Sequence, residues 1–265
     1  WNAQWSHNRY RIYYPKTMGD AVWSMYDYNR GCCDNICYSG VADIFRLPKF
    51  SLSFFRTQIA EGSMLPSGKM PYEVFIPAYR DEILSDTVMV YGNVDEVELV
   101  LNGKTIRRQT ADKGPDSDYI PVPNGGNGKN LHFPPFTFYG VSKERGVLKA
   151  VGYHQGKKVA EYTVKTPGVP ERLDITYFES GKPATKNDLL IVYVRMLDKQ
   201  GVLCPVNGIP VELSVQGGEI VGPTSYPLEA GVASFLVRTG EISKININAT
   251  GKGFSTRKSL KVGKE

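Results

Sequence analysis

The sequence lacks any apolar run near the roughly 20 residues that a membrane-spanning helix needs. Residues 1–11 also lack the basic start and apolar core of a secretory signal, so we expect a soluble chain that has already been trimmed. The formal net charge is only +5, and Lys and Arg are scattered along the chain instead of forming a basic stripe with interleaved aromatics. This pattern gives no indication of nucleic acid as a partner.

Cysteine is scarce, which excludes a disulfide-stapled scaffold for a chain of 265 residues. Three of the four cysteines, Cys32, Cys33 and Cys37, lie in one short segment, and Cys204 stands alone. A bridge between Cys33 and Cys37 is one alternative and free thiols are the favoured one, so the redox state of this cluster stays open. No second Cys pair or His-rich partner completes a zinc set, and we expect no metal site and no cofactor.

The first 60 residues hold only three of the 27 glycines but thirteen of the chain's thirty aromatic residues, which marks a domain boundary near residue 62. Spacing at three and four residues predicts a helix over residues 1–13, and Pro48 opens a second helix in which Phe50 and Phe54 share a face. Between the helices, the apolar run Ala21–Tyr26 has no strict alternation, which predicts a strand buried on both faces of a parallel sheet. The order helix, strand, helix therefore predicts an α/β unit over residues 1–62.

Beyond residue 62, apolar residues recur at every second position in strand-length runs separated by turns. Asn102 and Gly103 form a hairpin signal, and residues 166–170 form a short stiff linker in which two prolines flank a glycine. Two consecutive sandwiches are implied, at residues 63–166 and 171–265. The predicted fold class is thus mainly β, with two β-sandwiches preceded by an α/β unit.

Polar and aromatic side chains gather where the predicted strand Ala21–Tyr26 ends, and ligands bind at that end of strands in α/β sheets and barrels. The candidates that could hydrogen-bond a polyol are Asp27, Asn29, Arg30 and Asp34, and those that could stack on a sugar ring are Trp23, Tyr28 and Tyr38. The alternative is a polar loop whose carboxylates cap the following helix and pair with Arg46.

Three stretches of the same region carry a family resemblance: WSMYDYNRG at residues 23–31, DNICYSGV at 34–41 and RLPKF at 46–50. They resemble the end of the catalytic (β/α)8 barrel in β-galactosidase-like members of glycoside hydrolase family 2. In that family a substrate-side loop follows the last barrel strand, a stretch ending in Pro-Lys opens the last helix, and immunoglobulin-like (Ig-like) domains follow. Residues 96–104 and 148–161 are similar to the first accessory sandwich, and residues 171–265 resemble a bacterial Ig-like module. The resemblance implies that residues 1–62 are the C-terminal end of a TIM barrel.

The sequence departs from the family in one respect, because residues 1–60 contain no glutamate. Retaining glycosidases place two carboxylates roughly 5 Å apart on opposite sides of the bond that they cleave. Two aspartates on one loop, Asp27 and Asp34, cannot flank both sides of such a bond. We therefore expect no catalytic residue in this chain. The resemblance identifies it as the C-terminal part of a retaining β-galactosidase-like enzyme, and we expect this part to be inactive alone. In the intact enzyme, Trp23, Asp27, Tyr28, Asn29, Arg30 and Asp34 are the expected substrate-binding residues.

Two other functions stay in view. One is a carbohydrate-binding or adhesin-type protein of tandem Ig-like domains, which would need a separate fold for residues 1–60. The other is a metal- or thiol-dependent enzyme using the cysteine cluster and His7, which lacks ligand spacing. The expected partners are a glycan, the N-terminal part of the same polypeptide and, as an open question, a second copy of the chain. The expected location is the bacterial periplasm or outside the cell, with the cytoplasm left open. We also expect residues 1–60 either to pack onto the first sandwich as a small αβα layer or to be covered by another copy, while both sandwiches fold without them.

Overall fold

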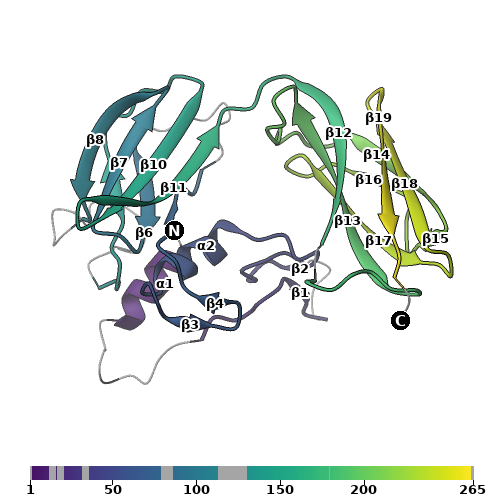
Figure 1. The fold of residues 1–265 in the computed structure, drawn as a ribbon, viewed down its shortest axis with the longest axis horizontal. Coiled ribbons are helices and arrows are strands. Elements are labelled where there is room, and N and C mark those ends of the chain that lie inside the picture. Colours follow the sequence, from purple (N-terminus) through teal and green to yellow (C-terminus); the bar gives the residue numbers. More distant parts are fainter. Residues whose placement is uncertain are drawn as a thin grey trace. The chain divides into compact units, whose positions relative to one another are not determined.

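The computed structural model describes residues 2–11, 16, 21–31, 36–78, 86–112, 130–178 and 180–263. The chain divides into two compact units, Trp1–Thr166 and Pro167–Glu265, and the division falls within the predicted linker (Figure 1). The predicted boundary at residue 62 stays a prediction. Both units are built mainly of β-strands arranged in several sheets, which confirms the predicted fold class.

The first unit begins with two helices and two short strand pairings. Both predicted helices are present, as α1 (Asn2–Arg11) and α2 (Phe50–Thr57). The short strands of this part are β1 (Tyr28–Asn29) paired with β2 (Ile36–Cys37), and β3 (Met64–Leu65) paired with β4 (Gly68–Lys69). No barrel is formed by the described part of residues 1–62.

The predicted buried strand Ala21–Tyr26 is wrong. Only Tyr26 pairs, in a single parallel bridge with Ala42, and the side chains of Trp23 and Met25 are 75% and 60% exposed. Among the described residues, only the stretch around Ala42 lies beside this segment, so no second neighbour completes a ladder. An apolar run becomes a doubly buried strand only where other elements cover both of its faces.

The first sandwich contains two sheets. One sheet has the order β11-β10-β7-β8 and the other has the order β5-β6-β9. Their strands are β5 (Val74–Phe75), β6 (Val88–Gly92), β7 (Glu96–Leu101), β8 (Lys104–Thr110), β9 (Phe136–Phe138), β10 (Val147–His154) and β11 (Lys157–Lys165). Strand β7 alternates as expected, with Val97, Leu99 and Leu101 buried. The hairpin between β7 and β8 turns at Asn102 and Gly103, which both have positive φ, as the sequence predicts.

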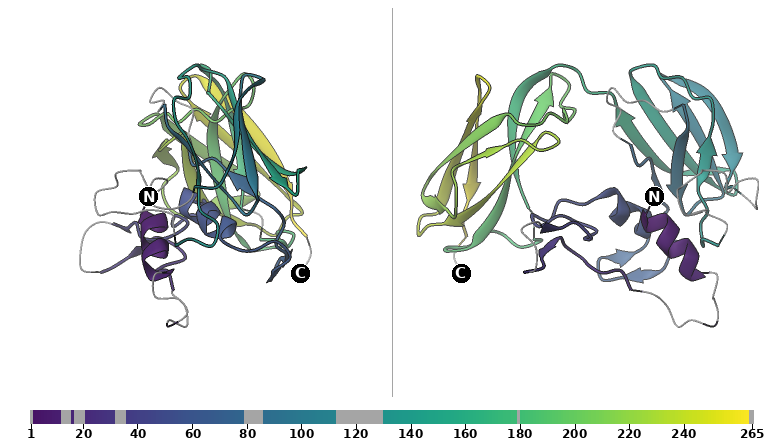
Figure 2. Two further views of the ribbon diagram at one scale, coloured as in Figure 1. Left: turned by 90° about the vertical axis from the view of Figure 1, so that its left-hand side faces the viewer. Right: turned by 180° about the vertical axis from the view of Figure 1, so that it is seen from behind.

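Strand β6 is buried along its whole length because it is covered from both sides. Val88 and Val90 join the core between the two sheets, which also holds Phe136 and Phe138. On the opposite face, Met89 and Tyr91 pack with Phe54 of α2 in a second hydrophobic cluster, against which Ala3 of α1 also packs. The two helices thus cover Met89 and Tyr91 on the outer face of this sheet. In Figure 2, α1 lies below the strands of the first sandwich.

Polar contacts reinforce this layer. Tyr91, whose pKa burial raises, donates its hydroxyl hydrogen to Gln4 of α1. Arg56 of α2 forms an ion pair with Glu73, and Glu73 raises the pKa of Arg56. Asn93 donates to the carbonyls of Ile59 and Pro71, each at 3.0 Å, and so fixes the segment between α2 and β5.

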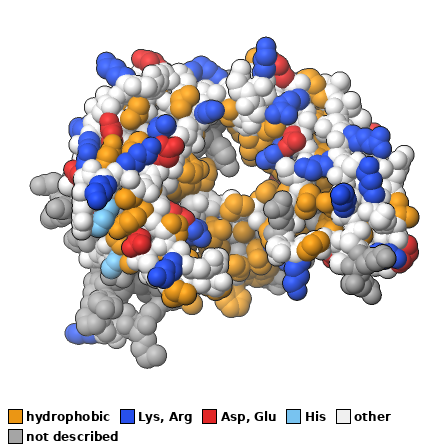
Figure 3. Space-filling model, viewed as in Figure 1, with side chains coloured by type: hydrophobic (Ala, Val, Ile, Leu, Met, Phe, Trp, Pro, Cys, Tyr) orange, Lys and Arg blue, Asp and Glu red, His pale blue; other side chains and the backbone are white. Residues whose placement is uncertain are grey.

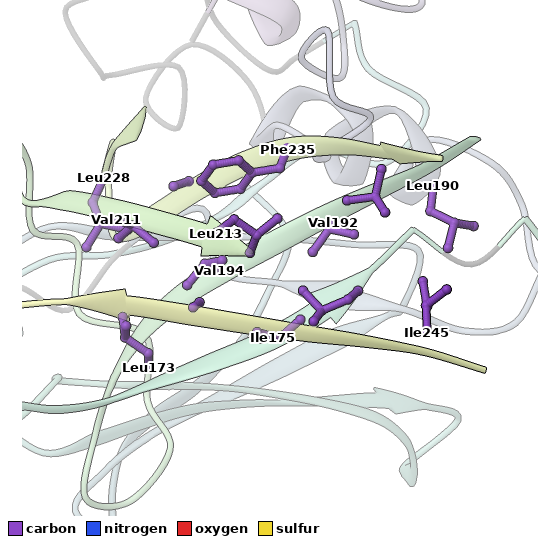
Figure 4. Packing of buried hydrophobic residues seen from close by; sticks show 14 of the residues in the cluster. Leu173, Ile175, Leu190, Val192, Val194, Val211, Leu213, Leu228, Phe235 and Ile245 are labelled. Carbon is purple, nitrogen blue, oxygen red and sulfur yellow. The ribbon is translucent and has the colours of Figure 1, made fainter. Parts of the chain in front are cut away.

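The second sandwich pairs two four-stranded sheets, with the orders β12-β13-β17-β15 and β16-β14-β18-β19. The strands are β12 (Pro170–Tyr177), β13 (Leu189–Asp198), β14 (Pro210–Gln216), β15 (Gly218–Ile220), β16 (Ser225–Pro227), β17 (Val232–Thr239), β18 (Lys244–Gly251) and β19 (Phe254–Lys261). Figure 4 shows inward side chains of both sheets gathered in one core: Val192, Val194 and Phe235 come from β13 and β17 of the first sheet, and Leu213 comes from β14 of the second. These strands lie in the part of the chain where the sequence predicts alternating, strand-length runs.

The surface carries mixed charges. On the face shown in Figure 3, Lys and Arg are spread over both sandwiches with Asp and Glu among them. In the described ranges, we find no helix long and apolar enough to cross a membrane.

Candidate functional site

The candidate site is built on three backbone stretches, which we call the loop base: residues 24–27, 40–42 and 47–49. Val41 donates its amide to Ser24 and Ala42 donates to Met25, while Asp27 donates back to Ala42, all at 3.0–3.1 Å. Lys49 in turn donates its amide to Val41 at 3.0 Å. The loop base therefore joins the segment before β1 to the segment that opens α2.

Gly40 explains why the loop base packs so closely. A Cβ atom at this position would lie 2.3 Å from the amide nitrogen of Asp27 and 2.4 Å from the carbonyl carbon of Tyr26. Both are backbone atoms and cannot move aside, so only glycine lets the two stretches approach.

Asp27 lies at the centre of the loop base. Its side chain is only 3% exposed, and its Oδ1 atom accepts hydrogen bonds from Lys49 Nζ at 2.6 Å and from the Gly40 amide at 2.9 Å. Lys49 also donates to the carbonyl of Tyr38 at 3.0 Å. The sequence left open whether Asp27 binds a polyol or pairs with Arg46. In the structure its carboxylate does pair with a cation, but that cation is Lys49. The guanidinium of Arg46 lies instead over the Tyr26 ring, 4.0 Å from its centroid.

The predicted sugar-contacting side chains lie around this base at the surface. Trp23 donates its indole hydrogen to the hydroxyl of Tyr28 at 2.8 Å, and the two rings meet edge to face with centroids 6.3 Å apart. The peptide bond after Trp23 is cis. Asn29 accepts a hydrogen bond from the Gly31 amide at 2.8 Å, and Arg30 is exposed. The structure thus brings Trp23 and Tyr28 into contact, with Asn29 and Arg30 exposed directly after Tyr28, whereas Asp34 lies outside the described residues.

Exposed apolar side chains accompany them. Tyr38 is 74% exposed, and Val22 and Met25 are 48% and 60% exposed. In Figure 3, hydrophobic side chains gather at the lower centre of the molecule, over the segment that contains β1 and β2. Contiguous apolar surface of this kind marks an interaction site on most soluble proteins.

The cysteine cluster is described only at Cys37, which is a free thiol. The hydroxyl of Ser39, 3.3 Å from the sulfur, lowers the pKa of this thiol, and Tyr28 and the charge of Arg30 act in the same direction. Cys32 and Cys33 lie outside the described residues. His7 lies far along the chain from this loop and packs edge-on against Phe54 and Phe55. Among the residues whose positions are described, no cluster of His, Cys, Asp or Glu could hold a metal ion.

The described carboxylates of the N-terminal part have structural partners. Asp43 accepts hydrogen bonds from the amides of Phe45 and Leu47, each at 2.8 Å, and so closes the turn before α2. Asp27 is held by Lys49 and Gly40. Asp27 and Asp43 are the two carboxylates within residues 21–31 and 36–60, and both are engaged in these structural contacts.

The role of Lys49 was not predicted from the sequence, where this residue appears only within the RLPKF motif. Its two acceptors are 22 and 11 residues away, so no local periodicity could have revealed them. The one available signal was that Asp27 follows an apolar segment, where a buried carboxylate needs a cationic partner.

Comparison with known proteins places these features in context. Residues 85–160 match a family described as a domain of unknown function (DUF4982). A β-galactosidase of Thermoanaerobacter pseudethanolicus is 32% identical over 241 residues, covering 85% of this chain and 30% of that protein. A β-galactosidase of Rhizobium radiobacter is 30% identical over 129 residues, covering 48% of this chain and 92% of that sequence.

The fold also matches that of a solved β-glucuronidase from glycoside hydrolase family 2, with a TM-score of 0.72 and 20% identity. That match covers 99% of this chain and 28% of the other. The chain spans 22–30% of the length of the first three curated relatives.

Proposed function

The chain belongs to glycoside hydrolase family 2, among its β-galactosidase-like members, and we propose on that basis that it forms the C-terminal part of an enzyme that hydrolyses terminal β-glycosides with retention. In this proposal the chain shapes the sugar site and supplies no catalytic residue. The rest of the polypeptide contributes the two carboxylates that retaining hydrolysis needs.

One observation carries the proposal: the loop around Trp23 presents aromatic and polar side chains at the surface on a rigid base. Trp23, Tyr28, Asn29 and Arg30 offer a stacking face, two hydrogen-bonding groups and a cation within a few residues. Asp34 belongs to the same predicted set. Asp27 was predicted to contact substrate as well, and its buried position leads us to assign it the role developed in the next subsection.

A second observation favours an incomplete catalytic domain over a self-contained adhesin. Val22 and Met25 are apolar and exposed, yet only one side of this segment has a backbone neighbour among the described residues. A further strand on the other side would cover these side chains and pair the backbone. We propose that the N-terminal part of the same polypeptide supplies it.

The test uses the full-length parent enzyme and a chromogenic aryl β-galactoside. We expect Trp23→Ala to lower kcat/KM by about 1–3 kcal/mol of transition-state binding, because the indole is lost from the sugar site. Its thermal stability should change little, since the side chain is 75% exposed. Met64→Ala is the matched control, because Met64 is exposed to the same extent but lies in β3, outside the loop.

Three outcomes decide between the alternatives. The 265-residue chain alone should not cleave the substrate above the buffer rate. Turnover by this chain that is lost on mutating Asp27 would contradict the proposal that the catalytic residues lie elsewhere. An unchanged kcat/KM in Trp23→Ala would show that the loop does not contact the sugar.

We further propose that the enzyme acts in the periplasm or outside the cell and that the parent protein forms a homo-oligomer. Cell fractionation of the native host and sedimentation of the full-length protein test these two points. Activity confined to the cytoplasmic fraction, or a monomer at micromolar concentration, would contradict them.

A further inference from the structure

Lys49 makes an unusual set of contacts for a lysine at the start of a helix. It is the residue before α2, and its side chain turns back to reach Asp27 and the carbonyl of Tyr38 instead of extending into water. Its side chain is 32% exposed and that of Asp27 is 3% exposed. One ammonium group therefore joins three parts of the chain: the segment before β1, the segment after β2 and the start of α2.

The contacts fix the backbone at Tyr38. On one side, β2 ends at Cys37, which pairs with Tyr28. On the other side, Gly40 is held by Asp27 and has no space for a side chain. Lys49 holds the carbonyl of Tyr38 between these two points, so the residue has little freedom to rotate away.

The ring of Tyr38 does not pack in the protein core. It is 74% exposed, and Lys49 Nζ lies 5.9 Å from its centroid. An aromatic ring that is exposed but has a fixed backbone is suited to stacking, because little conformational freedom is lost on binding. The same holds for Trp23, whose indole is fixed by its hydrogen bond to Tyr28.

We propose that Tyr38 is a glycan-contacting residue and that Lys49, held by Asp27, is the positioning residue that sets its place. This proposal rests on the proposed function, because it adds Lys49 to the same sugar site and assigns a role there to Tyr38, which the sequence named as a stacking candidate. Lys49 does not touch the glycan. It acts through the backbone of Tyr38.

The alternative is that Lys49 only neutralises a buried carboxylate. A double-mutant cycle in the full-length enzyme separates the two, with Lys49→Met, Tyr38→Ala and the double variant. We expect each single variant to lower kcat/KM about tenfold, mainly through a higher KM, because a ground-state contact is lost. The double variant should be no worse than Tyr38→Ala, because Lys49 has no ring left to position.

Two control variants accompany the cycle. Lys49→Arg keeps a cation that can reach both acceptors and should recover most of the KM. Lys186→Met removes a lysine from an ion pair of the second unit, with Glu241 at 3.2 Å, and should leave KM unchanged. If the two defects of the single variants multiply, or if Lys49→Met lowers stability with no change in KM, the positioning role is overturned.

Lys49→Met leaves a buried charge without its partner and is at risk of failing to fold. Asp27→Asn combined with Lys49→Met removes both charges and keeps an oxygen for the Gly40 amide, so it provides the folded variant for the same cycle. It should show the same rise in KM, and a wild-type KM in this variant would overturn the proposal.

Failure of the proposed function is distinguishable from failure of this inference. If the wild-type parent cleaves no β-glycoside, the proposed function fails, and hydrogen exchange in the 265-residue chain still tests the positioning role. The Gly40 amide should then exchange faster in Lys49→Met than in wild type and at the wild-type rate in Lys186→Met. Equal rates in all three would overturn the role of Lys49.

Discussion

The two sandwiches of this protein share an architecture but differ in what covers their outer faces. In the first, α1 and α2 bury Met89 and Tyr91 on the outer face of β6. In the second, the outward residues of β14 and β18 are polar, and Ser214 and Asn248 lie opposite each other in the β14–β18 ladder. A sheet with an apolar outer face depends on the element that covers it, whereas a sheet with a polar one does not. The first sandwich and the N-terminal segment therefore form one cooperative unit, and the second sandwich is self-sufficient.

This difference revises one expectation from the sequence. We no longer expect the first sandwich to fold without residues 1–60, because removing them would expose Phe75, Met89, Tyr91 and Leu131 together. The chain offers a direct way to separate the two units in an unfolding experiment. All three tryptophans lie in the first 60 residues, so tryptophan fluorescence reports on the first unit while circular dichroism reports on both.

The largest expected effect comes from Phe54, which is 3% exposed and packs against Tyr91. We expect Phe54→Ala to lower the free energy of unfolding of the first unit by about 3–5 kcal/mol, as a large core truncation does. The fluorescence transition should shift to lower urea concentration, and the second transition seen by circular dichroism should stay in place.

The matched variant is Phe235→Ala, in which a side chain 1% exposed is removed from the core of the second sandwich. It should shift only the circular dichroism transition, by a similar free energy. A Phe54→Ala variant that shifts both transitions equally would break the comparison, because it would show that the two units unfold together.

An intermediate effect is expected at Asn93, which is 3% exposed. Its side chain bonds to Ile59 and Pro71 and also accepts a hydrogen bond from the Glu73 amide at 2.6 Å. Asn93→Ala leaves three backbone groups without a partner, so we expect a loss of about 2–3 kcal/mol in the fluorescence transition.

Asn246→Ala sharpens the contrast, because Asn246 is a half-buried asparagine on the outer face of the second sandwich. It accepts one hydrogen bond, from Ser259 at 2.6 Å, and water can replace that partner. The expected loss is below about 1 kcal/mol. Equal losses at Asn93 and Asn246 would mean that the connecting segment adds nothing to the first unit.

The last expected effect concerns the stability of the second unit in acid. Burial alone would raise the pKa of Asp198, but hydrogen bonds from the backbone amides of Gly168, Val202, Gln200 and Gly201 outweigh it and hold the pKa below its ordinary value. A carboxylate with a depressed pKa contributes stability above its unfolded pKa, about 3.9, and that contribution is lost as the pH falls through the folded pKa. The second unit should therefore weaken below about pH 4.

Asp198→Asn should remove this acid dependence and lower the stability of the second unit by about 1–2 kcal/mol at neutral pH, because an amide cannot accept from all four donors. Circular dichroism melts between pH 2.5 and 7 provide the measurement. Asp95 of the first unit is the control. The Gln155 amide lowers its pKa, but its side chain is 51% exposed, so Asp95→Asn should change the acid dependence of the first unit less. If the stability of the second unit still falls in acid in Asp198→Asn, other titratable groups cause that acid dependence.

Two segments with the same local pattern show how far the sequence could predict this fold. Both are short and apolar, but the sequence predicts a doubly buried strand only for Ala21–Tyr26 and places Val88–Gly92 among the alternating strands. In the structure, Ala21–Tyr26 is exposed and Val88–Gly92 is buried on both faces, because cover on the second face comes from residues distant in sequence. The regular strands of the sandwiches needed no such information, since alternation alone marks a strand with one buried face.

The candidate site divides in the same way. Residue types and spacing could indicate Trp23, Tyr28, Asn29 and Arg30, because all lie within one stretch. Sequence alone could not pair Asp27 with Lys49, since the long side chains of Arg46 and Lys49 are equally plausible partners until the backbone turn at Asp43 sets their directions. The pairing depends on a turn geometry that has no signature in composition.

The packing of α2 over β6 also determines how long α2 lacks its partners during synthesis. Phe54 is made 37 residues before Tyr91 and 77 residues before Leu131, its partners in the same cluster. At about 5–20 residues per second, its ring waits roughly 2–7 s for Tyr91 and about 4–15 s for Leu131 after it leaves the decoding site. Throughout that interval α2 has a hydrophobic face and no sheet to receive it. We therefore expect chaperones that bind nascent apolar helices to contact the first unit of this chain during that interval.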